Sequence, residues 1–212
     1  MTSVLVLGGV RSGKSRYAER LVATSTDVTY VAPGPVPDPA LDPDWARRVA
    51  DHRARRPAHW RTVETADVPA AILAAPGAVL VDCLGTWLTR LLDDAGGWTD
   101  AAAAEAAVAR AIDALCAAVA ASSQPVVLVS NEVGLGVVPE HRSGRLFRDH
   151  LGRLNAAAAG VCDVVQLVVA GRVLDLSDAP TVGDAPLPGE RASRPRPPAG
   201  PPEHQPRRSS AR

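Results

Sequence analysis

Short, continuous apolar runs alternate with segments of helical spacing along most of the chain. The runs that predict strands are residues 2–7, 28–32, 78–81, 126–130 and 164–169. Continuous rather than alternating apolarity is typical of strands buried on both faces of a parallel sheet. Helical spacing predicts helices at residues 15–24, near 44–51, and at 85–93, 100–122 and 142–159. The pattern therefore predicts an α/β fold, with a mostly parallel sheet flanked by helices.

Proline and glycine mark where this pattern is interrupted. Residues 33–43 hold five prolines and predict an exposed loop. Gly171 separates the last apolar run from residues 172–176, which predicts a short C-terminal hairpin. Residues 177–212 hold nine of the 19 prolines and too few aliphatic side chains to offset the entropy of ordering. We therefore predict one domain, 1–176, followed by a disordered Pro/Arg-rich tail, 177–212.

The composition argues against several function classes. Lys+Arg and Asp+Glu balance at 23 each, so no overall positive field attracts nucleic acid or an anionic membrane surface. No stretch of 18 or more apolar residues predicts a membrane span, and the N-terminus does not resemble a secretion signal, so we expect a cytoplasmic protein. Cys83, Cys116 and Cys162 lie far apart, form no zinc-type pair and are expected to be small core residues.

A phosphate-binding loop follows the first predicted strand. It matches the pattern G-x-x-x-x-G-K-[ST] between a strand and a helix, the context in which that pattern cradles phosphates with backbone N–H groups. Its lysine is the only one in the chain, where every other basic residue is arginine. A compact ammonium suits a tight phosphate loop better than a planar guanidinium does. The predicted nucleotide-binding residues here are Gly8, Gly9, Val10, Arg11, Ser12, Gly13, Lys14 and Ser15.

Two oxygen-bearing side chains are candidates for holding Mg²⁺ beside the phosphates. Ser15 closes the loop, and Asp82 ends the predicted strand at 78–81. Hydroxyl and carboxylate oxygens are typical Mg²⁺ ligands in phosphoryl-transfer sites. The alternative for Asp82 is an ordinary strand-end or helix-capping role.

A histidine followed by arginines forms a second candidate site. His52 precedes Arg53, Ala54, Arg55 and Arg56, and Glu64 comes eight residues later. A neutral imidazole beside arginines that neutralise a polyphosphate can attack the α-phosphorus of a nucleotide and form a phosphoramidate. From spacing alone, a structural histidine and a solvated arginine cluster remain open.

Motifs narrow the function only partly. The Asn/Thr-Lys-x-Asp element of signalling GTPases is absent, since the one lysine belongs to the phosphate loop. Three classes remain: a nucleotidyl- and phosphotransferase, a simple small-molecule P-loop kinase, and a RecA-like ATP-binding module that acts on a protein partner.

Four segments together resemble a known family. They are the loop at 8–15, the element at 52–64, the run Asp-Cys-Leu-Gly-Thr-Trp-Leu at 82–88, and Ser-Asn-Glu-Val-Gly-Leu-Gly-Val-Val-Pro-Glu at 130–140. In this order they resemble the bifunctional adenosylcobinamide kinase/adenosylcobinamide-phosphate guanylyltransferase of cobalamin assembly. The resemblance spans residues 1–176. One departure is Pro33, where related chains carry a hydroxyl residue.

The resemblance implies a RecA-like P-loop fold, a homotrimer and two reactions at one loop. ATP or GTP phosphorylates the aminopropanol hydroxyl of adenosylcobinamide. GTP then transfers GMP to a histidine, matched by His52, and the GMP passes to the cobinamide phosphate. Arg53–Arg56, Glu64 and Asp82 match positions that handle GTP in the family. Asn131, Glu132 and the helix arginines Arg142, Arg145 and Arg148 are expected at the corrinoid side or a subunit interface. For the three arginines the alternative is a solvated helix face.

Overall fold

The computed structural model of the chain describes residues 2–187, which divide into two compact units after Asp178. The first unit contains every helix and strand of the described residues, and residues 179–187 have neither. No helix in the described part of the chain is long and apolar enough to cross a membrane. Residues 188–212 of the predicted disordered tail lie outside the described range, so that disorder stays a prediction.

Strands and helices alternate along the first unit. The strands are β1 (Ser3–Gly8), β2 (Val28–Ala32), β3 (Arg61–Glu64), β4 (Ala78–Asp82), β5 (Val126–Asn131), β6 (Val164–Val169) and β7 (Arg172–Asp175). The helices are α1 (Lys14–Val22), α2 (Pro43–Arg55), α3 (Val68–Leu73), α4 (Leu84–Asp94), α5 (Ala101–Ala121) and α6 (Arg142–Val161).

The strands form one sheet in the order β3-β2-β4-β5-β1-β6-β7. All neighbours pair in parallel except β6 and β7, which form the predicted antiparallel hairpin. The carboxyl ends of the six parallel strands therefore meet at one edge of the sheet. Ligands of open α/β sheets bind outside that edge. The predicted fold class, a mostly parallel sheet flanked by helices with a short C-terminal hairpin, is confirmed.

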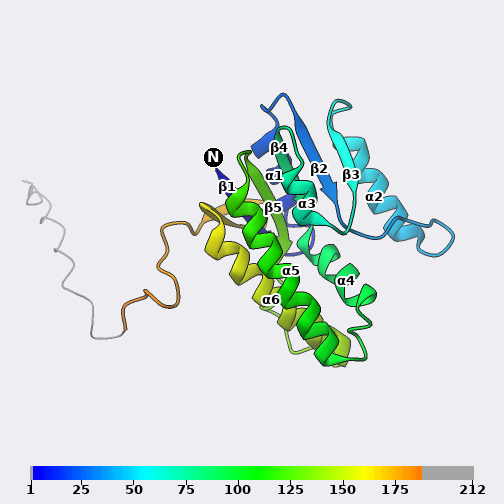
Figure 1. Ribbon diagram of the computed structural model, residues 1–212, viewed down its shortest axis with the longest axis vertical. Helices are drawn as coiled ribbons and strands as arrows, with labels where there is room; N and C mark the ends of the chain where they lie inside the picture. Colours follow the sequence, from blue (N-terminus) through cyan, green and yellow to red (C-terminus); the bar gives the residue numbers. More distant parts are fainter. Residues whose placement is uncertain (1, 188–212) are drawn as a thin grey trace, which may run out of the picture. The chain divides into compact units, whose positions relative to one another are not determined.

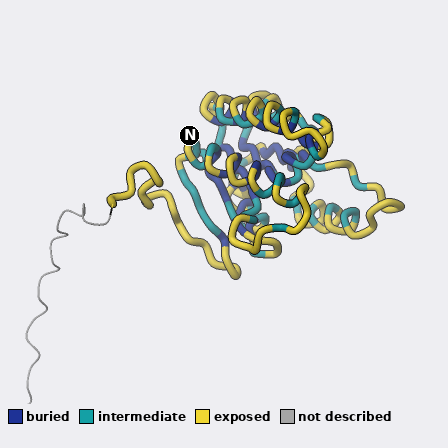
Figure 2. The backbone as a smooth tube through the Cα atoms, turned by 90° about the horizontal axis from the view of Figure 1, so that it is seen from below, coloured by how far each residue is buried: buried dark blue, intermediate teal, exposed yellow. Residues whose placement is uncertain are grey.

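Aliphatic side chains fill a core on each face of the sheet. Leu5 and Val6, adjacent in β1, belong to different cores because successive strand residues point to opposite faces. Helices α3, α4, α5 and α6 cover one face, and α1 covers the other (Figure 1). The buried tube in Figure 2 follows the central strands, while the outer turns of the helices are exposed.

Two elements were not predicted, and one helix is longer than expected. Strand β3 has mostly exposed, polar residues because it forms the sheet edge, so it lacks the apolar run that marked the other strands. Helix α3 has only six residues and contains a proline. Helix α2 starts at Pro43, where Asp42 caps it by accepting a hydrogen bond from the Trp45 N–H at 2.8 Å. It ends at Arg55 rather than near residue 51, so His52 lies on the helix.

Deleting residues 180–212 is expected to leave the first unit intact. The tail is rich in proline and poor in aliphatic residues, and its described part, 179–187, contains no helix or strand. Thermal unfolding and steady-state turnover of the truncated and full-length proteins would test this. A large fall in the melting temperature or in turnover would contradict it.

Candidate active site

The phosphate-binding loop runs from the end of β1 to the start of α1. Arg11 and Gly13 both have positive φ, at 57° and 100°, so the backbone alternates handedness as anion-binding nests do. Lys14 is only 6% exposed, and its Nζ donates to the carbonyl oxygen of Gly9 at 3.2 Å. Burial lowers the pKa of Lys14, although the nearby Cys83 and Asp82 act in the opposite direction. The loop therefore has a buried cation and the backbone form that phosphate binding requires.

Neighbouring strands hold this loop in place. The N–H of Glu132, just after β5, donates to the Gly8 carbonyl at 3.1 Å. On the other side, the N–H of Gly171, in the β6–β7 turn, donates to the Ser12 carbonyl at 3.2 Å. The C-terminal hairpin thus supports the loop directly.

Gly8→Ala is expected to destabilise the protein by about 1–3 kcal/mol, the usual cost of overpacking. A Cβ at Gly8 would lie 2.6 Å from both Ser12 Oγ and the Val168 carbonyl oxygen. Gly9→Ala is the matched control because a Cβ there meets no atom within 4 Å. Denaturant unfolding without nucleotide measures both. Equal stability of the two variants would contradict the close approach at Gly8.

A cavity of about 350 Å³ opens at the carboxyl edge of the sheet beside the loop. The predicted site residues Val10, Lys14, Ser15, His52, Arg56, Glu64 and Asp82 all line it. The loop after β2, predicted to be exposed, also forms part of its wall, through Gly34, Pro35, Val36 and Pro37. Trp45 Nε1 fixes that loop by donating to the Pro35 carbonyl at 3.2 Å.

Asp82, at the end of β4, lies between two functional side chains. Its Oδ2 accepts a hydrogen bond from the Tyr30 hydroxyl at 3.2 Å and lies 3.6 Å from His52 Nδ1. The side chain of Asp82 is 6% exposed and that of His52 is 24% exposed. Burial acts to raise the pKa of Asp82, but interactions with His52, Ser15 and Lys14 outweigh burial and hold that pKa below its ordinary value. The carboxylate is therefore charged at neutral pH.

This contact also orients the imidazole. A carboxylate beside Nδ1 favours the tautomer that carries its proton on that nitrogen. The lone pair then resides on Nε2, which is the atom left to act as a nucleophile or a base.

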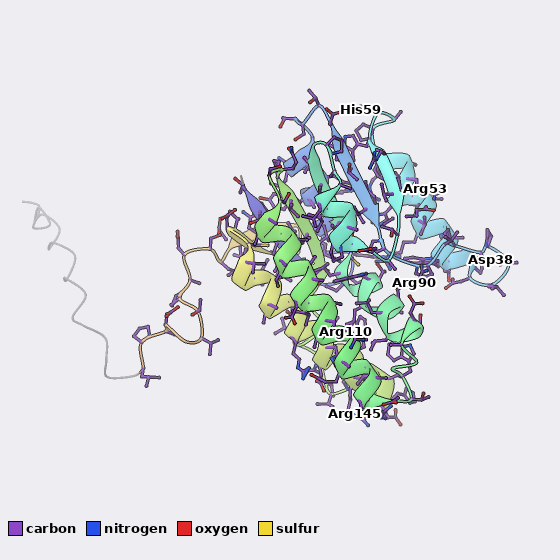
Figure 3. All side chains as sticks on the ribbon, in the orientation of Figure 1. Asp38, Arg53, His59, Arg90, Arg110 and Arg145 are labelled. Carbon is purple, nitrogen blue, oxygen red and sulfur yellow. The ribbon has the colours of Figure 1, made fainter. Side chains whose placement is uncertain are left out.

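The arginines of the cluster do not act as one group in the structure. Arg53 forms an ion pair with Glu64, and Arg55 Nη2 lies 3.2 Å from Glu19 of α1. Figure 3 marks Arg53 on α2. The guanidinium of Arg56 stacks on the ring of Tyr30, 3.8 Å from its centroid. The acidic and aromatic partners hold the three guanidinium groups in different places.

A second cavity, of about 490 Å³, adjoins this cluster. It is lined by Arg53, Arg56, Pro57, Ala58, Trp60, Thr62 and Glu64. Several predicted residues line neither of these two cavities: Ala54 and Arg55 of the cluster, and Gly8, Gly9, Arg11, Ser12 and Gly13 of the phosphate loop. His59 is exposed, also lines neither, and stands where the chain turns into β3 (Figure 3).

Sequence reasoning missed several residues of the first cavity. Arg48 lines it and acts electrostatically on Lys14. Arg48 lies four residues before His52, so both lie on one face of α2. The predicted helix ended near residue 51, and the shared face was therefore not predicted. Tyr30 occupies the middle of a buried strand, where nothing in the sequence distinguishes it from a structural residue. Asn131, expected at the corrinoid side or a subunit interface, is the last residue of β5 and lines the cavity.

The cysteines and the α6 arginines match expectation only in part. All three cysteines are partly exposed, yet Cys162 and Cys83 pack against the two hydrophobic cores, and Cys83 also lines the cavity. Arg145 Nη1 donates to the carbonyls of Pro139 and Glu140 at 2.9 and 2.6 Å. Arg148 likewise donates to carbonyls of the β5–α6 loop. These side chains therefore anchor that loop, and the helix face that carries them is not purely solvated. Figure 3 marks Arg145 near the start of α6.

The donors around Asp82 fit a magnesium ion. Ser15 supplies a hydroxyl beside the buried, ionised carboxylate of Asp82, and both line the cavity with Lys14. Within residues 2–187 no group of three or more His, Cys, Asp or Glu side chains can hold a metal. Mg²⁺ commonly takes one or two protein oxygens and completes its shell with phosphates and water.

Comparisons with known proteins agree with this site. The chain is 44% identical over 182 residues to the bifunctional adenosylcobalamin biosynthesis protein CobU of Salmonella typhimurium, covering 79% of this chain and 96% of that protein. It is 42% identical over 183 residues to CobP of Pseudomonas aeruginosa, described in the same words, covering 83% and 98%.

A solved structure of an ATPase from the type III secretion system of pathogenic bacteria shares the fold, with a TM-score of 0.50 at 11% identity. It covers 78% of this chain, and the chain spans only half of that ATPase. The family model described as cobinamide kinase / cobinamide phosphate guanyltransferase matches residues 4–176. The chain therefore belongs to the bifunctional cobinamide kinase/cobinamide phosphate guanylyltransferase family, an assignment that replaces both the simple kinase and the RecA-like module.

Proposed function

We propose that the cavity around Asp82 carries out both reactions of the family, phosphorylation of adenosylcobinamide and transfer of GMP to the resulting phosphate. The observation that carries the proposal is that the phosphate-loop lysine, Lys14, and the candidate nucleophile, His52, line the same cavity. Asp82 contacts His52 directly and interacts electrostatically with Lys14. A simple kinase needs the lysine but has no use for the oriented imidazole.

In the kinase step, the aminopropanol hydroxyl oxygen bonds to the γ-phosphorus of the nucleoside triphosphate. The bond from that phosphorus to the β–γ bridging oxygen breaks, the nucleoside diphosphate leaves with the electron pair, and the hydroxyl proton is released to water. Catalysis of such a transfer is mainly positioning and charge stabilisation. Lys14 and the loop N–H groups supply both. A magnesium ion, held by Ser15 and Asp82, would neutralise charge on the β- and γ-phosphates.

In the guanylyl step, His52 Nε2 attacks the α-phosphorus of GTP, the α–β bridging bond breaks, and pyrophosphate leaves. A phosphate oxygen of adenosylcobinamide phosphate then attacks the same phosphorus, and the P–N bond breaks to release adenosylcobinamide-GDP. Asp82 holds the imidazole in the required tautomer. Arg53 and Arg56 line the adjoining cavity, where Arg53 pairs with Glu64 and Arg56 stacks on Tyr30. Both guanidinium groups bind GTP in this proposal while they keep part of those contacts.

Separate assays of the two half-reactions test this function. Wild-type protein with adenosylcobinamide and ATP should accumulate the phosphate ester, and adding GTP should convert the ester to the GDP derivative with release of pyrophosphate. ATP in place of GTP should give no nucleotidyl product. Failure to phosphorylate, or guanylylation without pyrophosphate release, would contradict the proposal. A homotrimer remains a prediction, which light scattering in solution would test.

A further inference from the structure

Asn131 lies beside the phosphate-binding loop and has no role in the steps above. It is the last residue of β5, it pairs in register with Gly8, and its side chain lines the cavity. β5 lies between β4, which ends at Asp82, and β1, which leads into the loop. Asn131 therefore stands at the carboxyl edge of the sheet, on the side of Asp82 away from β2 and α2.

The position of Asn131 is fixed by buried hydrogen bonds. Its backbone carbonyl accepts from Asn155 Nδ2 at 3.0 Å, and Asn155 Oδ1 accepts from the hydroxyl of Ser130, which is fully buried, at 2.6 Å. These contacts anchor the end of β5 to helix α6. A residue held in this way presents its side chain with little freedom to move.

The amide of Asn131 is also oriented. Its Oδ1 accepts a hydrogen bond from the thiol of Cys83 at 3.5 Å and packs at 3.2 Å from where a Cβ on Gly85 would be. Oδ1 thus faces the start of α4. Nδ2, the donor end of the amide, makes no hydrogen bond within the described residues 2–187 and is not among their buried unpaired atoms.

We propose that Asn131 Nδ2 donates a hydrogen bond to an oxygen of the transferring γ-phosphoryl group in the kinase step, and that Cys83 is the residue that positions it. The proposal rests on the proposed function of this cavity. A fixed, neutral donor aimed at a site of developing negative charge stabilises a transition state without reorganisation. The Cys83 thiol stabilises the amide in the orientation observed, because its S–H donates to Oδ1.

The proposal separates the two chemistries. In the kinase step the γ-phosphoryl group is the reacting centre, so a lost donor there lowers kcat. In the guanylyl step the reacting centre is the α-phosphorus, and the γ-phosphate departs within pyrophosphate. Asn131 should therefore matter far more for phosphorylation than for labelling of the protein with GMP.

The test compares Asn131→Ala and Asn131→Asp with wild type in both half-reactions. Asn131→Asp keeps the side-chain size, removes the donor and adds a charge that repels phosphate. The expected result is a fall in kinase kcat on the order of 10²-fold, the usual effect of removing one such donor. In Asn131→Ala, which adds no charge, KM for the nucleotide should change much less, and the initial rate of GMP labelling should stay within about threefold, well below that effect.

Cys83 supplies a second, independent arm. Cys83→Ala should lower kinase kcat, while Cys83→Ser, which retains a donor, should restore most of it. In the Asn131→Ala background, Cys83→Ala should cause no further loss, because Cys83 acts through Asn131. Thermal unfolding of each variant identifies any that fail to fold. If the Asn131 variants do not fold, the comparison of Cys83→Ala with Cys83→Ser tests the proposal instead.

Two results would overturn the inference. One is a kinase kcat within threefold of wild type in Asn131→Asp. The other is an equal loss of kinase and labelling activity in Asn131→Ala, which would indicate a structural role. With either result, the wild-type protein would still carry out both reactions. If the proposed function itself were wrong, the wild-type protein would fail in one or both of them.

Discussion

Replacing His52 with Asn is expected to abolish transfer of GMP while most kinase turnover survives. Asparagine keeps a polar side chain of similar reach but lacks the basic lone pair that attacks the α-phosphorus. The kinase step depends on Lys14, Ser15 and Asp82, and this substitution removes none of them. Formation of adenosylcobinamide-GDP should fall by at least about 10³-fold, as expected when a covalent nucleophile is lost. Phosphorylation by ATP should change by less than about tenfold, the range of general positioning effects.

His59→Asn is the matched control because that histidine is exposed and lies outside both cavities. It should retain both activities. Equal loss of both activities in His52→Asn would mean that His52 supports the fold or nucleotide binding in general. Loss of transfer in His59→Asn alone would place the nucleophile there instead.

Lys14→Ala is expected to remove most triphosphate binding and, with it, both activities. Lys14 is the buried cation of the loop, whereas Arg11 is exposed, so water cannot easily replace Lys14. Removing a hydrogen-bonded charge from a buried phosphate contact typically costs about 2–5 kcal/mol, or about 30- to 5,000-fold in affinity. Titration calorimetry with GTP and a non-hydrolysable ATP analogue would measure the loss.

Arg20→Ala gives a control for the removal of positive charge. Arg20 is an exposed cation on the same helix, so its loss should change affinity by less than about threefold, as expected for a screened surface charge. Near wild-type affinity in Lys14→Ala would contradict the phosphate-binding role of the loop. Lys14→Arg should rescue only partly, since a planar guanidinium does not fit the space of an ammonium.

The elements that the sequence predicts well are those where one physical requirement dominates. Strands β1, β4 and β5 are buried on both faces, so their residues are continuously apolar. The phosphate loop needs glycines at defined positions, because Gly8 meets Ser12 closely and Gly13 has positive φ. These constraints are local, and they are therefore visible in the sequence.

The elements that it misses depend on contacts between distant segments. β3 is a strand only because β2 offers it a free edge, and its exposed Thr62 and Glu64 give no apolar signal. Likewise, the separation of the arginines follows from Glu19, Glu64 and Tyr30, which belong to three different elements. The three guanidinium groups at residues 53–56 therefore do not form one cationic group in the structure, although Arg53 and Arg56 line one cavity, and their binding of nucleotide stays a prediction.

Asn131 illustrates the same limit within the site. Its side chain matters only because β5 lies next to the phosphate loop and because Cys83, 48 positions away, contacts its Oδ1. Neither fact follows from local sequence. The motif at 130–140 drew attention to this segment, but the fold was needed to place one of its residues at the phosphates.

Incubation of the wild-type protein with GTP labelled at either the α- or the γ-phosphate, followed by peptide mapping, tests the central claim most directly. The account predicts label from α-labelled GTP only, at one GMP per chain, on the peptide that contains His52. The bond should be labile to acid and stable to alkali, as a phosphoramidate is. Label on another residue, label from the γ-phosphate, or no covalent label while adenosylcobinamide-GDP still forms would contradict it.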